Sequence, residues 1–139
     1  MRRRGNINII IANYLDNNFE FMSDITDINI NNKELRHIII SRWYYGVYLI
    51  AKDYLINNFI CTDDKSNFHH KTNEDAHIYS IWHRIGNVQN GIFHSDLIQG
   101  EQLAKLREDY EYTGNLCNDT DFNNAKRIFN EIYEILNRF

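Results

Sequence analysis

The chain has 139 residues, a length that suits a single domain over residues 1–139 with its own hydrophobic core. Hydrophobic residues make up 43% of the sequence and aromatic residues 14%, which excludes an intrinsically disordered chain. The net charge of −4 indicates no general affinity for nucleic acid, although the basic run Arg2–Arg4 is a candidate contact for a phosphate backbone.

Cysteine and histidine usage argues against disulfides and metal sites. Cys61 and Cys117 are far apart in the sequence, which favours a reduced, cytoplasmic protein. We expect no signal peptide, and the longest apolar run without charge, Trp43–Ala51, is too short to cross a bilayer. We therefore expect no membrane segment, no metal and no cofactor, because the histidines of the middle third match no zinc pattern: His69, His70, His77, His83 and His94.

The first half of the chain is organised around one apolar segment. Periodicity predicts a first helix over Asn6–Phe21 and a polar loop over Ser23–Asn32. The next segment, Lys33–Asn58, is apolar on almost every side when placed on a helix. A helix of this kind belongs in the middle of a core, so we expect the other helices to pack around it.

The second half predicts three further helices. A polar connection over 59–73 leads to a third helix that begins near Thr72 or Asn73, with acidic residues in its first turn. A fourth helix is expected over Asp96–Tyr112, and a last one over Phe122–Phe139 with Asp121 as its cap. No segment alternates with period two. The prediction is an all-α fold, an up-and-down bundle of about five helices.

Arg42 stands out because it lies midway along the most apolar helix. An unpaired buried guanidinium would cost several kcal/mol, so we expect Arg42 to be buried and paired with a carboxylate, for which Asp109 is the natural candidate. One interpretation is a structural ion pair or a side chain that reaches the surface. The other is a cation held ready for a phosphate, whose oxygens match the planar guanidinium.

The segment Lys105–Tyr110 is the second polar group of interest. Arg107 and Tyr110 are three residues apart and share a helix face. Instead of pairing with Arg42, Asp109 could form a charge pair on the helix surface. Among the histidines, a single one such as His77 is a candidate general acid or base, or a phosphate contact. The aromatic run in the central helix is better explained by core packing than by base stacking.

Three segments together resemble a known family. Ser41–Tyr48 resembles the S-R-x-Y-Y-A-x-F helix of small HEPN-domain proteins of bacteria and archaea. His77 matches the S/T-H element of that family, and Lys105–Tyr110 matches its R-x-R-A-D-Y element. Lys105 stands at the first arginine of that element, and Glu108 replaces its alanine. The three segments occur in the family's order.

The resemblance implies a HEPN-like bundle that forms homodimers and belongs to a toxin–antitoxin or phage-defence system, often beside a nucleotidyltransferase antitoxin. Many members are metal-independent endoribonucleases, in which an arginine is followed four to six residues later by a histidine. No histidine follows Arg107, and the nearest such pair, Arg84 and His94, is more widely spaced. The usual ribonuclease signature is therefore absent.

Two functional hypotheses follow from the resemblance. In the first, a HEPN-type toxin or defence protein cleaves RNA: His77 moves the proton, Arg42 and Arg107 hold the phosphate, and Asp109 orients one arginine. In the second, these residues form a buried strut, and a non-catalytic module binds a nucleotide, RNA or a partner protein such as the antitoxin. A third interpretation is a helical interaction protein outside the family. The other members of the candidate cluster are Tyr45, Lys105 and Tyr110.

Overall fold

The computed structural model describes residues 1–18 and 32–139, and this part of the chain is helical, which confirms the predicted all-α class. Its α-helices are α1 (Arg2–Asn17), α3 (Asn32–Asn57), α4 (Ile81–Gly86), α5 (His94–Leu97), α6 (Gly100–Glu111) and α7 (Asp119–Leu136). Two short 3₁₀ turns are η1 (Lys65–Asn67) and η2 (Val88–Gly91). Within the same ranges, no helix has the length and apolar character needed to span a membrane.

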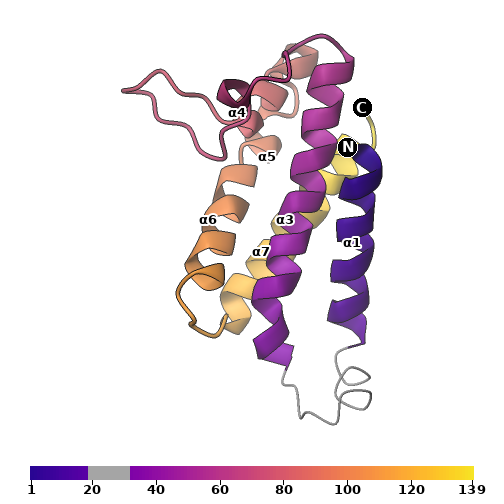
Figure 1. The fold of residues 1–139 in the computed structure, drawn as a ribbon, viewed down its shortest axis with the longest axis vertical. Helices are drawn as coiled ribbons and strands as arrows, with labels where there is room; N and C mark the ends of the chain where they lie inside the picture. Colours follow the sequence, from indigo (N-terminus) through magenta and orange to yellow (C-terminus); the bar gives the residue numbers. More distant parts are fainter. Residues whose placement is uncertain (19–31) are drawn as a thin grey trace.

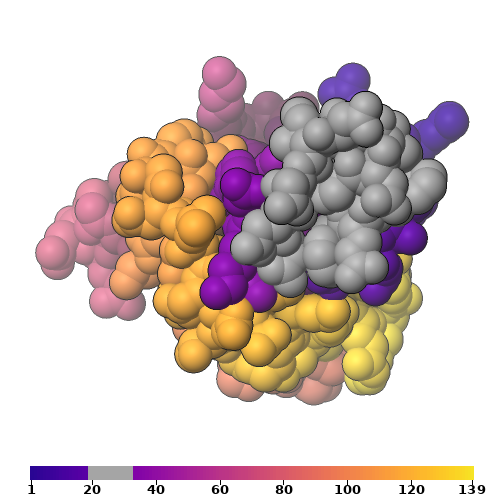
Figure 2. Space-filling model, turned by 90° about the horizontal axis from the view of Figure 1, so that it is seen from below, coloured from indigo at the N-terminus to yellow at the C-terminus, as the bar shows by residue number. Residues whose placement is uncertain are grey.

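The long helices run alternately up and down (Figure 1). Helix α3 occupies the centre and packs against α1, α4, α6 and α7, as the apolar sequence of Lys33–Asn58 predicted. Helices α1 and α6 flank α3 on opposite sides, α7 lies behind it, and the two termini meet at one end (Figure 1). Seen from the opposite end, Figure 2 shows the connection from α6 to α7 packed beside the first turns of α3.

Trp43 joins three of these helices. Its ring is fully buried and stacks on Phe122 and Phe129 of α7, with ring centroids 5.6 and 5.2 Å apart. The indole nitrogen donates a hydrogen bond of 2.9 Å to the side-chain oxygen of Asn13 in α1. A tryptophan with this degree of burial contributes about 3–5 kcal/mol of stability, so the α1–α3–α7 contact is a major part of the core.

The backbones of α1 and α3 cross closely at two glycines. A Cβ atom at Gly5 would lie 2.7 Å from the carbonyl oxygen of Gly46. A Cβ atom at Gly46 would lie 2.5 Å from Cγ1 of Ile9. Both distances are shorter than van der Waals contact, so the crossing requires residues without a side chain.

The third and the last predicted helices begin at other residues in the structure. The third helix begins at Ile81, where the buried Ser80 accepts a 3.0 Å hydrogen bond from the His83 amide. The expected start near Thr72 or Asn73 is wrong, because residues 73–78 close a turn with two backbone hydrogen bonds. The last helix is capped by Asn118 rather than Asp121, so α7 begins three residues earlier than predicted.

The predicted fourth helix, Asp96–Tyr112, is divided into α5 and α6. Gly100 opens α6 and lies against Trp82, since a Cβ atom at this position would be 2.0 Å from the indole ring. The first helix begins at Arg2, before the predicted Asn6. Its predicted last residues and most of the Ser23–Asn32 loop lie outside the described residues.

Candidate functional site

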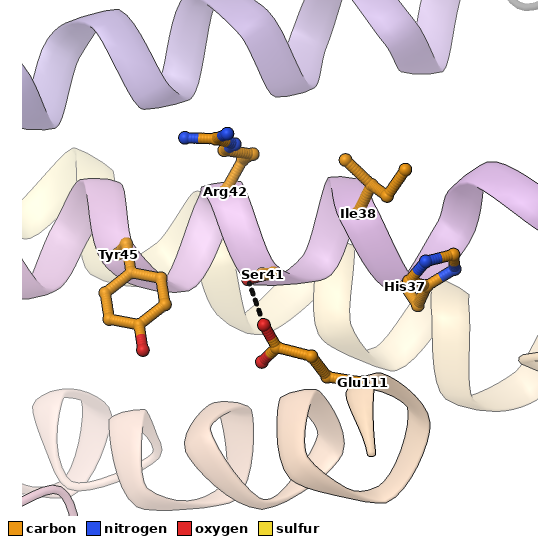
Figure 3. Close-up of a pocket in the computed structure, with 6 residues that line it drawn as sticks. All are labelled: His37, Ile38, Ser41, Arg42, Tyr45 and Glu111. Atoms are coloured by element: carbon orange, nitrogen blue, oxygen red, sulfur yellow. Dashed lines mark hydrogen bonds between the residues drawn. The ribbon is translucent and has the colours of Figure 1, made fainter. Parts of the chain in front are cut away.

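A groove lies on the face of α3 that α1 and α6 leave uncovered. Its volume is about 470 Å³. A second hollow of about 260 Å³ shares His37 and Glu111 with it and continues toward the loop at 114–116. We call the two hollows together the α3–α6 groove. The residues that line its larger part are His37, Ile38, Ser41, Arg42, Tyr45 and Glu111 (Figure 3).

The spacing of the groove residues explains why they share one face. His37, Ser41 and Tyr45 are each four residues apart, so they lie on successive turns of the same side of α3. Figure 3 shows Tyr45 directed toward α6 and Arg42 directed toward α1. The polar stripe thus follows α3 between its two neighbouring helices, and an otherwise apolar helix presents hydroxyl and imidazole groups to solvent.

Arg42 is exposed, so the prediction that it is buried is wrong. Its Nη1 donates a 2.9 Å hydrogen bond to the side-chain oxygen of Asn8 in α1. Asp109 is exposed on α6 and does not pair with Arg42, which corrects the predicted ion pair as well. The physical reason is that α1 and α6 flank this face of α3 without covering it, so water solvates the guanidinium and no carboxylate is required.

Two guanidinium groups are buried in the described part of the chain, those of Arg36 and Arg107, and the one beside the groove belongs to Arg107, which is only 4% exposed. Its Nη1 donates a hydrogen bond to the Tyr45 hydroxyl and lies 3.5 Å from Oε2 of Glu111. Its Cζ lies 5.0 Å and 4.9 Å from the ring centroids of Tyr44 and Tyr45. Groups of the protein itself therefore compensate the charge of Arg107. This arrangement is expected of a structural strut between α6 and α3.

His70 fastens the α3–α4 connection to the same cluster. Its Nδ1 is hydrogen bonded to the hydroxyl of Tyr44, whose pKa is raised far above its ordinary value by burial. Burial also lowers the pKa of His70, and the nearby charge of Arg107 lowers it further. The neutral imidazole therefore accepts a hydrogen bond from the Tyr44 hydroxyl, and this bond holds the connection against α3.

An ion pair and a side-chain hydrogen bond hold the same connection to α6. Lys71 pairs with Glu108 at 2.7 Å and lowers the pKa of that carboxyl group. The side chain of Thr72 donates a 2.6 Å hydrogen bond to Glu101. The connection is thus attached to both helices that border the α3–α6 groove.

The structure does not bring the predicted catalytic residues together. His77 is exposed in the turn at 73–78, with a positive φ of 53°, and contacts neither Arg42 nor Arg107. Lys105 is exposed on α6. Tyr110 lines the smaller hollow of the groove and donates a hydrogen bond to Asp121, which raises the pKa of Tyr110 to about 12. Of the seven predicted site residues, Arg42, Tyr45 and Tyr110 line the groove. The other four do not: His77, Lys105, Arg107 and Asp109.

Among the residues that sequence reasoning missed are three polar side chains of the larger hollow, His37, Ser41 and Glu111. The signal that would have found the first two is their four-residue spacing with Tyr45, a polar stripe within an apolar helix. Glu111 follows Arg107 by one helical turn, so the two side chains share a face of α6. This pair connects the buried cluster to the groove.

The groove presents an imidazole, a guanidinium, two hydroxyl groups and a carboxylate to solvent. This set can bind an anion and a group that donates hydrogen bonds at the same time. Across residues 1–18 and 32–139, no three metal-ligand side chains of the His, Cys, Asp and Glu types gather at one place. No protein-family model, curated protein or solved structure matches the chain.

Proposed function

We propose that this protein is a HEPN-type module of a toxin or defence system that binds RNA in the α3–α6 groove. The observation that carries the proposal is Arg42, an exposed guanidinium at the groove whose one side-chain partner among the described residues is Asn8. A guanidinium has five N–H donors, so most of them remain for a ligand. Phosphate oxygens match this planar set of donors.

A second cation supports a phosphate contact beside Arg42. Asn8, the partner of Arg42, donates a 2.9 Å hydrogen bond to the backbone carbonyl of Arg4. Arg4 therefore lies one helical turn away on the same side of α1, and its side chain is exposed. Contacts between cations and the phosphates of a nucleic acid contribute to binding independently of base sequence.

The positions of the residues that were expected to perform catalysis favour RNA binding over RNA cleavage. Arg107 is engaged with Tyr45 and Glu111, and His77 makes no contact with either arginine. The imidazole that lines the groove with Arg42 belongs to His37. A metal-independent endoribonuclease is therefore the second candidate, and it would use His37 rather than His77 as the proton carrier.

The proposal extends to the protein's assembly and compartment. A homodimer and a nucleotidyltransferase-type antitoxin are the partners that the family resemblance implies. A cytoplasmic location fits Cys61 and Cys117, which are both free thiols, because reducing compartments keep cysteines in this state. Sedimentation of the purified chain as a monomer at micromolar concentration would contradict the dimer.

RNA binding is tested with a fluorescent single-stranded RNA in EDTA. Arg42→Ala should weaken binding about tenfold and reduce the slope of log affinity against log salt by about one unit. The matched control is Arg127→Ala, which removes an exposed arginine of α7 that pairs with Glu131. This control should bind as the unchanged protein does. Equal affinity of Arg42→Ala and the unchanged protein would overturn the proposal.

The same incubation separates the two candidate functions. Intact RNA after prolonged incubation in EDTA identifies a binding module. Fragments that disappear when His37→Ala replaces the unchanged protein identify a metal-independent ribonuclease. His77→Ala is the comparison, and it should have no effect in either case because His77 lies in an exposed turn outside the groove.

A further inference from the structure

The two carboxylate oxygens of Glu111 have different surroundings. Oε2 is buried and faces Nη1 of Arg107 at 3.5 Å, without a hydrogen bond. Oε1 is directed toward Ser41, whose hydroxyl donates to it over 3.5 Å, the outer limit for a hydrogen bond. Figure 3 shows this carboxylate on the α6 side of the groove, opposite the stripe of α3. Oε1 therefore keeps most of its capacity to accept hydrogen bonds.

Arg107 holds the Glu111 carboxylate from the buried side, which limits the orientations that the acceptor can take. Arg107 is itself fixed by its hydrogen bond to Tyr45 and by the two tyrosine rings. The acceptor that faces the groove is thus preorganised rather than free to turn into solvent. Preorganised acceptors discriminate strongly between ligands that offer a donor and ligands that offer another acceptor.

This inference rests on the proposed binding of RNA, and it concerns the base. Guanine presents two adjacent N–H donors on its Watson–Crick edge, and both can donate to the single oxygen, Oε1, that Glu111 turns to the groove. Adenine and cytosine each place a ring acceptor beside their amino group, and uracil places a carbonyl on both sides of its single N–H. Against one exposed carboxylate oxygen, guanine alone offers two neighbouring N–H groups, whereas each of the other bases offers one donor group beside an acceptor.

The other groove residues suit a nucleotide in this orientation. Arg42 lies on the α1 side and Glu111 on the α6 side, so a phosphate and a base edge would be drawn to opposite sides (Figure 3). Tyr45 lies one helical turn along α3 from Ser41, at one end of the groove, and offers an aromatic ring against which a base can pack (Figure 3). We propose that the α3–α6 groove selects guanosine in single-stranded RNA, with Arg42 at its phosphate and Glu111 at its Watson–Crick edge.

The test uses short uridine oligonucleotides that differ only in one central residue: guanosine, inosine, adenosine or 1-methylguanosine. The full chain should bind the guanosine strand about tenfold more tightly than the adenosine strand. Inosine lacks the exocyclic amine and should fall between them, while methylation of N1 should abolish the preference. Because these comparisons change the ligand, they need no protein variant that folds. Equal affinity for all four strands would overturn the inference.

Glu111→Gln provides the complementary test. An amide keeps the size of the side chain but presents an N–H donor as well as an acceptor, so the preference for guanosine over adenosine should fall below about twofold. The two proposals fail separately. Affinities that depend on Arg42 but not on the base would leave RNA binding in place and remove guanosine selection. Affinities that do not depend on Arg42 would remove RNA binding itself.

Discussion

Arg107 of α6 and Tyr45 of α3 form a contact that combines a hydrogen bond with a cation over an aromatic ring. The guanidinium donates to the phenolic oxygen, and its Cζ lies 4.9 Å from the ring centroid. Through Tyr45 and Glu111, the same guanidinium fixes two residues that line the α3–α6 groove. The stability of the bundle and the shape of the groove are therefore coupled at one side chain.

Replacing Arg107 by methionine should destabilise the protein strongly. The substitution keeps side-chain volume but leaves the buried Oε2 of Glu111 without a cation, which costs about 3–5 kcal/mol for a broken buried pair. Urea unfolding measures the loss. The control, Arg42→Met, changes an exposed guanidinium and should stay within about 0.5 kcal/mol of the unchanged protein. Similar losses in both variants would contradict the assignment of Arg107 as the strut.

Acidification should weaken the fold through His70. Burial lowers the pKa of this imidazole below its ordinary value of 6.5, so the unfolded chain binds a proton that the folded chain does not. The free energy of unfolding is therefore highest above pH ~7 and falls as the pH drops toward the pKa of folded His70. Urea unfolding at several pH values between ~7.5 and ~5 measures this slope.

The variant His70→Gln should reduce the pH slope, because it removes the titrating group while keeping a side-chain hydrogen bond within reach of Tyr44. The variant His77→Gln removes an exposed imidazole and should keep the slope of the unchanged protein. A slope that survives His70→Gln unchanged would show that another group controls the acid sensitivity.

Gly5→Ala should lower the melting temperature. Alanine favours a helix over glycine by about 1 kcal/mol, but its Cβ would lie 2.7 Å from the backbone oxygen of Gly46. Because α3 cannot withdraw a backbone atom without moving, the overpacking should cost about 1–3 kcal/mol. Asn130→Ala, on the exposed side of α7, should instead raise stability by a few tenths of a kcal/mol. A higher melting temperature for Gly5→Ala would refute the close crossing.

Asn118→Ala should cost about 1 kcal/mol, because the side-chain oxygen of Asn118 accepts a 2.8 Å hydrogen bond from the Asp121 amide at the start of α7. Asn118→Asp keeps this acceptor and should retain most of the stability, as thermal unfolding would report. The amide nitrogen of Asn118 also donates to Tyr110. An equal loss in both variants would assign the effect to that second bond.

Periodicity located α3 because an apolar surface on every side has few alternatives to a central helix. It did not identify which arginines are buried, namely Arg36 and Arg107. Arg42 has apolar neighbours in sequence, yet it falls on the one side of α3 that faces solvent. Arg107 follows the fully buried Leu103 by four residues, so it occupies the inner side of α6. The side of a helix, rather than the polarity of adjacent residues, determined burial.

Two boundaries depended on contacts that a single sequence does not specify. Glu74 and Asp75 are typical of a first helical turn. In the structure, however, this segment forms a turn closed by backbone hydrogen bonds, and the helix begins only after its cap, Ser80. The break between α5 and α6 is set by the packing of Gly100 against Trp82. The groove was missed for a similar reason, since Glu111 meets Ser41 only after α6 folds against α3.

The central position of α3 has an evolutionary consequence. One side of the helix is constrained by α7 and the glycine crossing, and the opposite side by whatever the groove binds. Selection would therefore act on nearly every position of α3, for two independent reasons. Among divergent homologues, substitutions should accumulate early in the exposed turn at 73–78 and late along Ser41–Tyr45.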